Sequence, residues 1–192
     1  MSETSLSRRE FMHRGAGAAL LLPFIVGGCE QRMTAAEAAR TEVPLRTLTI
    51  GEGSALSRLG SLLVPGSSEA GLAHYIDHQL SAPAGENMLM IRYLGVPAPF
   101  TGFYRSGLKA LNAAARQRHG ADFDALTAEQ AQIFLADFAA GKIADWQGPP
   151  LPLFYFVART DAIDVVYGTE QGFASLDVPY MPHIAPPSNW GT

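Results

Sequence analysis

The sequence predicts a mainly α-helical fold: a single helical domain of about five to six helices and an irregular, proline-rich C-terminal tail. Apolar residues recur at helical spacing in several segments of the 192-residue chain. Prolines and glycines stand where these segments end, and a capping pattern precedes one of them. The expected organisation is a leader over residues 1–28, a tether over 29–44 and the helical domain over 45–192.

The first two helices are marked by apolar stripes and by the turn between them. One face of the first helix carries Leu56, Leu59, Leu62 and Leu63. Pro65-Gly66 ends this helix, and Ser68 is the candidate N-cap of the second. The buried stripe of the second helix comprises Leu72, Tyr75, Ile76 and Leu80.

Two segments with glycine ends follow. Residues 88–94 form a short apolar segment that Gly95 ends. Residues 100–119 predict a longer amphipathic helix, with Gly120 as its C-terminal cap. Glycine suits both ends because it adopts the left-handed conformation without steric cost.

The last two predicted helices are the most apolar. Thr127 and Gln130 form a capping-box pattern before a helix that Gly141 closes. Residues 151–167, the most apolar stretch, are expected to form the central helix, although their aromatic and β-branched content leaves a strand open. After Gly168 the chain is expected to be irregular, because it carries Pro179, Pro182, Pro186 and Pro187.

The N-terminal segment has the organisation of an export signal. Three arginines precede an apolar run over residues 15–28, which is too short to span a bilayer. The order Arg8-Arg9 and then Phe11 resembles the twin-arginine signature, whose export route moves folded proteins. The alternative is an ordinary secretory signal with an accidental arginine pair. Either signal predicts a periplasmic protein.

The chain has one cysteine, and it follows the apolar run. Val26-Gly27-Gly28-Cys29 resembles a lipobox, so Cys29 is a candidate lipidation site that would anchor the chain to the inner membrane. The alternative is cleavage at small residues without lipidation. Beyond Cys29 no cysteine remains for a disulfide or a thiol nucleophile. The formal net charge of −4 argues against a nucleic-acid-binding surface.

Three features invite a catalytic interpretation. Residues 45–50 followed by Gly51 and Gly53 look like a strand entering a phosphate loop, but Leu56 stands where the third glycine belongs, which favours a glycine-marked turn before a helix. His74 and His78 are four residues apart and could hold a metal ion, but no third ligand has a recognisable spacing.

The third feature is a pair of carboxylates near the end of the predicted central helix. Asp161 and Asp164 lie beside Arg159, and their spacing suits a helix end that turns toward solvent as well as it suits a catalytic pair. Together, these features give no self-contained active site and no cofactor site in this chain.

Several blocks resemble the gluconate 2-dehydrogenase subunit 3 family. The first is Pro65-Gly66-x-x-x-Ala70-Gly71-x-x-x-Tyr75-Ile76-Asp77. The later blocks are Tyr104-x-x-Gly107-Leu108, Phe123-x-x-Leu126, Phe154-Tyr155-Phe156, Tyr167-Gly168, Pro179-Tyr180 and Trp190. One departure is the C-terminal end, where Gly168 to Phe173 replaces the glycine-rich ending common in the family.

The resemblance implies a helical, non-catalytic subunit rather than an enzyme by itself. Its partner would be a large FAD-dependent subunit of the glucose-methanol-choline type, exported together with the small one, and a cytochrome c often receives the electrons. Within the first block, Tyr75 and Ile76 are expected to supply core contacts, and Asp77 to satisfy a buried backbone or hydroxyl group. The tail residues Tyr180, Met181 and Trp190 are expected to contact either the partner or the chain's own surface.

Three functions therefore remain open. The first is a non-catalytic small subunit of a periplasmic FAD-dependent sugar, sugar-acid or glycoside dehydrogenase that assists export, assembly and stability of the large subunit. The second is a free-standing periplasmic lipoprotein that binds a small ligand in a helical groove. The third is a metal-dependent hydrolase that uses His74 and His78.

Overall fold

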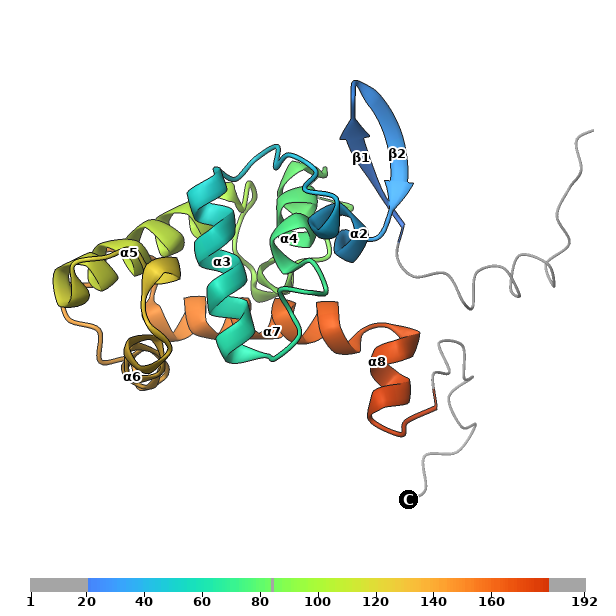
Figure 1. The fold of residues 1–192 in the computed structure, drawn as a ribbon. Coiled ribbons are helices and arrows are strands. Elements are labelled where there is room, and N and C mark those ends of the chain that lie inside the picture. Colours follow the sequence, from blue (N-terminus) through green and yellow to red (C-terminus); the bar gives the residue numbers. More distant parts are fainter. Residues whose placement is uncertain (1–20, 84, 180–192) are drawn as a thin grey trace, which may run out of the picture.

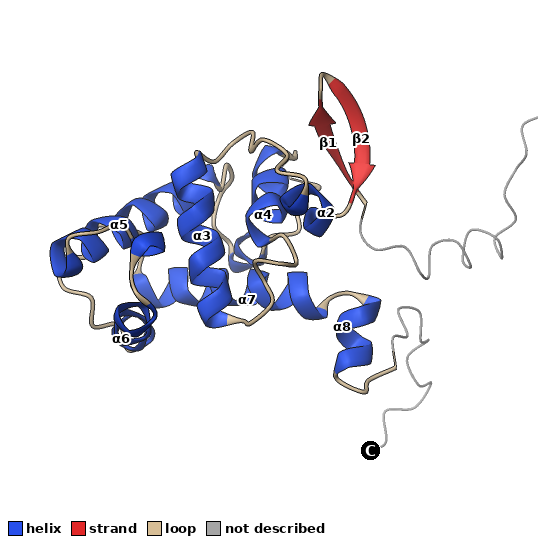
Figure 2. Cartoon of the chain, viewed as in Figure 1, coloured by secondary structure: helices blue, strands red, loops and turns tan. Residues whose placement is uncertain are grey.

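The computed structural model describes residues 21–83 and 85–179, and in these ranges the protein is mainly helical (Figures 1 and 2). The described residues form seven α-helices, two short 3-10 helices and one antiparallel hairpin. In chain order they are β1 Leu22–Val26, β2 Cys29–Met33, α2 Ala35–Arg40, α3 Ile50–Leu63, α4 Leu72–Ser81, η1 Met90–Leu94, α5 Thr101–His119, η2 Phe123–Ala125, α6 Ala128–Ala139, α7 Leu151–Tyr167 and α8 Glu170–Ser175.

Residues Leu151–Tyr167 form one continuous helix, α7, which packs against most of the other helices of the domain. It begins directly after Pro150 and contacts α3, α4, α6, α8 and η1. Figure 1 shows it running along one side of the bundle. Its buried side chains include Phe154, Val157 and Ala162, each fully removed from solvent. The helical alternative was therefore the correct one for this apolar stretch.

An aromatic cluster joins α5, α6 and α7. The ring of Phe154 lies 5.7 Å from Phe103, 6.2 Å from Phe138 and 5.9 Å from Trp146, measured between ring centroids. Phe154 is accommodated because Gly107 of α5 has no side chain, and a Cβ there would collide with its ring. Burying one such aromatic side chain contributes about 1.5–3 kcal/mol.

Three helices begin with a capping box. Thr127 and Gln130 cap α6 as predicted, and the same reciprocal bonds join Thr49 to Glu52 at α3 and Thr34 to Glu37 at α2. Helix α3 therefore starts before its leucine stripe, and Gly51 and Gly53 lie inside its first turns. The expected turn at these glycines is wrong, and residues 45–49 form no strand.

The start of α4 also differs from the prediction. Ser68 does not cap this helix, which begins after Gly71 without a side-chain cap. Gly71 has φ +83°, the left-handed conformation, and its missing side chain leaves room for the backbone of Ala35 in α2. Helix α2 therefore packs directly on the turn between α3 and α4.

The short elements at both ends explain why the helix number exceeds the expected five to six. Residues 29–44, expected as a tether, include strand β2 and helix α2, and α2 contacts α4. Residues 170–175, expected to be irregular, form α8, in which Thr169 accepts a hydrogen bond from the Gly172 amide. Both helices have only six residues and were not visible as apolar stripes.

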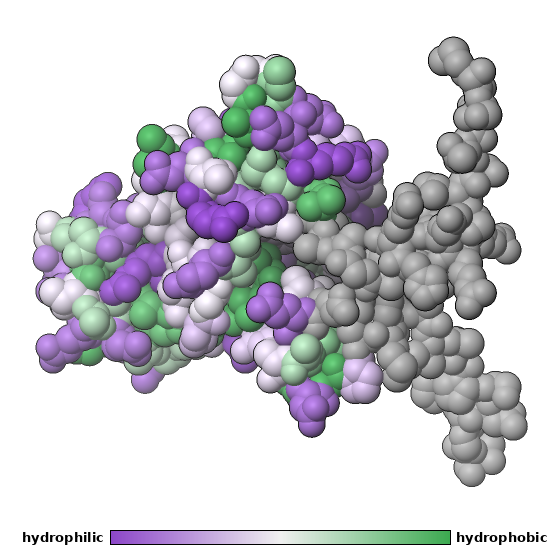
Figure 3. Space-filling model, turned by 45° about the vertical axis from the view of Figure 1, so that its right-hand side comes forward, coloured by the Kyte–Doolittle hydropathy of each residue, from purple (hydrophilic) through white to green (hydrophobic). Residues whose placement is uncertain are grey.

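The surface of the described residues is mixed in polarity. Figure 3 shows apolar areas scattered among polar ones on the face that it draws. The most exposed large apolar side chains of the described residues are Ile50 at 88% and Tyr93 at 65%. No helix in the described ranges is long and apolar enough to cross a membrane.

Candidate functional site

Asp77, the last residue of the first family-like block, binds the segment that leads into α3. Its carboxylate accepts hydrogen bonds from the amides of Arg46 at 2.8 Å, Thr47 at 2.8 Å and Leu48 at 2.7 Å. The side chain is buried, and an ionised carboxylate is purely an acceptor, so three donors suit it well. This confirms the expectation that Asp77 satisfies a buried backbone group.

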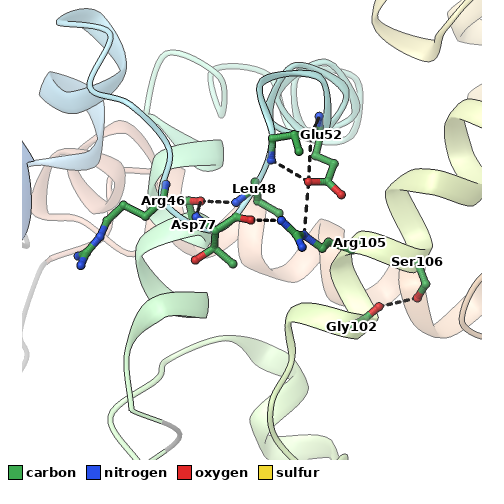
Figure 4. A network of polar contacts seen from close by, with 9 residues as sticks. Arg46, Leu48, Glu52, Asp77, Gly102, Arg105 and Ser106 are labelled. Atoms are coloured by element: carbon green, nitrogen blue, oxygen red, sulfur yellow. Dashed lines mark hydrogen bonds and ion pairs between the residues drawn. The ribbon is translucent and has the colours of Figure 1, made fainter.

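Helix α5 reaches the same segment through Arg105. Figure 4 shows Asp77 on one side of the segment and Arg105 approaching from the other. The Arg105 guanidinium donates to the Thr47 carbonyl, and its Nε lies 3.5 Å from Glu52 Oε2. Glu52 Oε2 also accepts from the Thr49 amide at 2.7 Å, which belongs to the capping box of α3. The network therefore joins α3, α4 and α5 through one irregular segment.

The remaining residues of the first block serve the turn and the core. Pro65 and Gly66 lie in the exposed turn after α3, with Gly66 at φ +88°. Ala70 is half-buried, and Gly71 is covered by α2. The core contacts expected of Tyr75 and Ile76 are present, since these side chains are 8% and 0% exposed. Each residue of the block thus has a structural use.

Asp161 is a second buried carboxylate, in the middle of the core. It is completely buried and accepts hydrogen bonds from the Met90 amide at 2.8 Å and from the Tyr104 hydroxyl. Burial raises the pKa of Asp161 to about 6, although both hydrogen bonds oppose the shift. The interpretation that this carboxylate pair turns toward solvent is therefore wrong for Asp161 and holds for Asp164, which is exposed.

Two tyrosines face this carboxylate. Burial, followed by the charge of Asp161, raises the pKa of Tyr104 well above its ordinary value, and the same two causes raise the pKa of Tyr75. Asp161 and Tyr104 are inaccessible to solvent, so no substrate reaches them without opening the fold. The arrangement joins α5, α7 and η1 rather than presenting an acid–base pair.

The two histidines of α4 pack against an aromatic side chain. His74 Nε2 lies 2.8 Å from the Val43 carbonyl oxygen, which engages one ring nitrogen. The ring of Phe24 lies against both histidines, and burial lowers the pKa of His78. Within residues 21–83 and 85–179, no three His, Cys, Asp or Glu side chains are grouped as metal ligands.

Phe24 belongs to a hairpin whose turn contains the lipobox-like glycines. Val26 pairs with Cys29, and Gly27 and Gly28 have φ +58° and +83° between them. Two successive residues at positive φ make the tight turn that favours hairpins, and glycine adopts both without strain. Cys29 is exposed at the start of β2. Gly27 and Gly28 therefore form the hairpin turn, in addition to their predicted role in the lipobox.

An open groove of about 790 Å³ lies between α2 and the start of α4. Its lining includes Glu37 and Arg40 from α2, Ser57 from α3, and Glu69 and His74 near α4. These polar and charged side chains could hold a small polar ligand.

Two predicted sites lie outside the described residues. They are the arginine signal of Arg8, Arg9 and Phe11, and the tail residues Tyr180, Met181 and Trp190.

Two features of the site were not predicted from the sequence. Helix α2, which packs on Gly71, has a local signal in the capping pair Thr34 and Glu37, although this pair does not indicate the contact itself. The Tyr104–Asp161 bond joins residues 57 positions apart and has no local signal.

One of three comparisons with known proteins gave a match. The model of a family described as gluconate 2-dehydrogenase subunit 3 matches residues 52–185, which run from the first turn of α3 through α8. Neither the curated proteins nor the solved structures gave a match. The matched range contains the Asp77 block, the Asp161 core and the aromatic cluster, and on this evidence the chain belongs to the gluconate 2-dehydrogenase subunit 3 family.

Proposed function

We propose that this chain is the non-catalytic small subunit of a periplasmic, membrane-associated, FAD-dependent dehydrogenase of sugars, sugar acids or glycosides. The observation that carries the proposal is the family match over residues 52–185, since the family is named as a subunit of a dehydrogenase. The chain would assist export, assembly and stability of the large subunit. The description of the family as a subunit 3 implies a complex of several subunits.

The use that the fold makes of its polar residues supports a scaffold role. Asp77 binds three backbone amides, and Asp161 binds a backbone amide and a buried hydroxyl. Each of these carboxylates has its hydrogen-bonding capacity committed inside the fold. Such residues stabilise the fold, as a non-catalytic subunit requires.

The chemistry would then lie in the partner. We propose that FAD is bound by a large subunit of the glucose-methanol-choline type and that a cytochrome c is a candidate electron acceptor. The twin-arginine-like signal of Arg8 and Arg9 supports export of a folded complex, because that route moves folded proteins. Lipidation of Cys29 would hold the complex at the inner membrane.

The test is co-expression of the full chain with the candidate large subunit, followed by co-purification and cell fractionation. Arg8→Lys and Arg9→Lys are introduced together, and flavin-dependent sugar oxidation is measured in periplasm and cytoplasm. We expect both subunits and the activity to remain in the cytoplasm. Arg14→Lys, outside the pair, is the matched control and should leave export unchanged.

Two results would refute the proposal. One is a large subunit that does not co-purify with this chain. The other is sugar oxidation by the purified chain alone with a dye acceptor, because a non-catalytic subunit cannot carry it out.

The groove between α2 and α4 favours one second candidate, a free-standing lipoprotein that binds a small polar ligand. Glu69→Lys and Arg40→Glu reverse two charges of its lining, so they should abolish binding of such a ligand in a calorimetric titration. Retention of the large subunit by the same variants would favour the subunit role.

A further inference from the structure

The N-terminal hairpin is bound to α4 by the apolar face of β1. The ring centroid of Phe24 lies 6.3 Å from that of His74 and 5.6 Å from that of His78. Phe24 is 3% exposed and Leu22, two residues earlier on the same face, is 5% exposed. Ile25 on the opposite face is 42% exposed, so only one face of the strand is buried.

The hairpin depends on this contact for its stability. An isolated two-stranded hairpin is marginally stable in water, because its few hydrogen bonds do not compensate for the ordering of the chain. Strand β2 adds little burial, since residues 29–32 are exposed. Leu22 and Phe24 are therefore the two buried anchors that hold the hairpin on the domain.

This bound strand lies inside the apolar run of the expected export signal. The run covers residues 15–28, and β1 covers Leu22–Val26. Lipoprotein processing would cut the Gly28–Cys29 peptide bond, which joins the tight turn of the same hairpin to the start of β2. A segment held against its own domain cannot bind another protein at the same time.

We propose that the His74–His78 face of α4 is a binding site for the apolar core of the chain's own export signal, and that the bound hairpin withholds the signal and the Gly28–Cys29 bond until it opens. The site takes an extended segment with alternating apolar side chains, one of them aromatic. Only the open fraction of the chain is competent for export, so the binding equilibrium limits the export rate. The export role of residues 1–28 is part of the proposed function, and this inference rests on it.

The first experiment measures the contact itself in the full chain. A chain that carries Arg8→Lys and Arg9→Lys is purified with its leader attached, and hydrogen exchange is followed in peptides covering residues 21–33. His78→Glu leaves the signal unchanged and places a charge next to the Phe24 ring. We expect slow exchange in the parent and about tenfold faster exchange in the His78→Glu variant.

The matched control is Ser81→Glu, which adds the same charge at an exposed position of α4. It should leave the hairpin protected. Exchange of peptides from α5 and α7 should be the same in all three chains, which shows that the domain has stayed folded.

The second experiment measures the consequence. With the natural arginine pair restored, pulse-chase labelling follows the rate at which the chain reaches the periplasm. We expect His78→Glu to be exported about tenfold faster than the natural chain, because its open fraction is larger. Ser81→Glu should match the natural chain.

Each alternative outcome is decisive. Unprotected exchange over residues 21–33 in the parent, or protection that survives His78→Glu, shows that α4 is not the binding site. If His78→Glu frees the hairpin but export is no faster, the contact with α4 does not withhold the signal. If the arginine pair itself proves irrelevant to export, the proposed function fails instead, while the exchange experiment still reports on the binding site.

Discussion

The hydroxyl of Tyr104 in α5 donates a hydrogen bond to the carboxylate of Asp161 in α7, inside the core. The same carboxylate accepts from the Met90 amide of η1 at 2.8 Å. Helix α7 therefore meets two consecutive earlier elements, η1 and α5, at one ionisable group. A charge at this position is costly without water, so the group links the stability of the domain to pH.

We expect Asp161→Asn to remove a pH dependence of stability between about pH 4 and 6. The folded-state pKa of Asp161 is raised from 3.8 to about 6, so in this window the folded state binds more protons than the unfolded state. The stabilisation is fully present below the unfolded pKa and is lost as pH rises through about 6. A shift of this size corresponds to about 3 kcal/mol.

Urea unfolding of the purified chain at half-unit steps from pH 3.5 to 7.5 measures this effect. The difference between the natural chain and Asp161→Asn should change over the stated window. Glu69→Gln removes an exposed carboxylate and controls for the change in net charge. Parallel curves for the natural chain and Asp161→Asn would show that Asp161 does not titrate in the fold.

The Asp77 network yields a graded prediction. Asp77→Ala leaves the amides of Arg46, Thr47 and Leu48 without their acceptor, and we expect a loss of roughly 2–4 kcal/mol in the free energy of unfolding. Asp77→Asn keeps one carbonyl oxygen, which can still accept from Thr47 and Leu48, so its loss should be smaller. Equal losses in both variants would mean that the packing of the side chain, and not its hydrogen bonds, stabilises the segment.

The two glycines of the first block separate backbone strain from close packing. Gly66 and Gly71 both have positive φ, but a Cβ at Gly66 meets nothing within 4 Å, whereas one at Gly71 collides with Ala35. We expect Gly66→Ala to cost about 1 kcal/mol through strain alone and Gly71→Ala to cost more than about 2 kcal/mol. Gly71→Ala should also speed hydrogen exchange in residues 35–40. Unchanged exchange in these residues would show that α2 does not pack on this turn.

The sequence could predict the elements that have strong local signals. The capping box of α6, the glycine end of α5 and the apolar stretch of α7 each lie within one helix, and the structure confirms all three. That Asp77 would accept hydrogen bonds from a buried group was predicted, because a carboxylate among core residues needs donors. Which groups donate could not be predicted, because the donors lie 29–31 residues away and no sequence pattern indicates them.

Short elements and long-range pairs explain what was missed. Helices α2 and α8 are too short for an apolar stripe, and capping residues such as Thr34 are their clearest local signal. The burial of Asp161 could not be predicted, since its partner Tyr104 comes from another helix. The hairpin was hidden because the same residues matched a signal segment, and one pattern of apolar residues and glycines served both interpretations.

The crossing of α5 and α7 allows a test in which two glycine substitutions in one helix act in opposite directions. Gly107 is covered by the Phe154 ring, while a Cβ at Gly102 meets nothing within 4 Å. Alanine is favoured over glycine in helices by about 1 kcal/mol, so Gly102→Ala should stabilise the domain slightly. Gly107→Ala should destabilise it by about 1–3 kcal/mol, because the ring has to move in a packed core.

A second substitution shows whether this contact is responsible. Phe154→Leu shortens the facing side chain, so combining it with Gly107→Ala should cost less than the sum of the two single losses in a double-mutant cycle. Thermal and urea unfolding of the four chains measure the coupling. Additive losses would mean that Gly107 is needed for a reason other than the ring of Phe154, and the aromatic cluster would then not set the approach of α5 to α7.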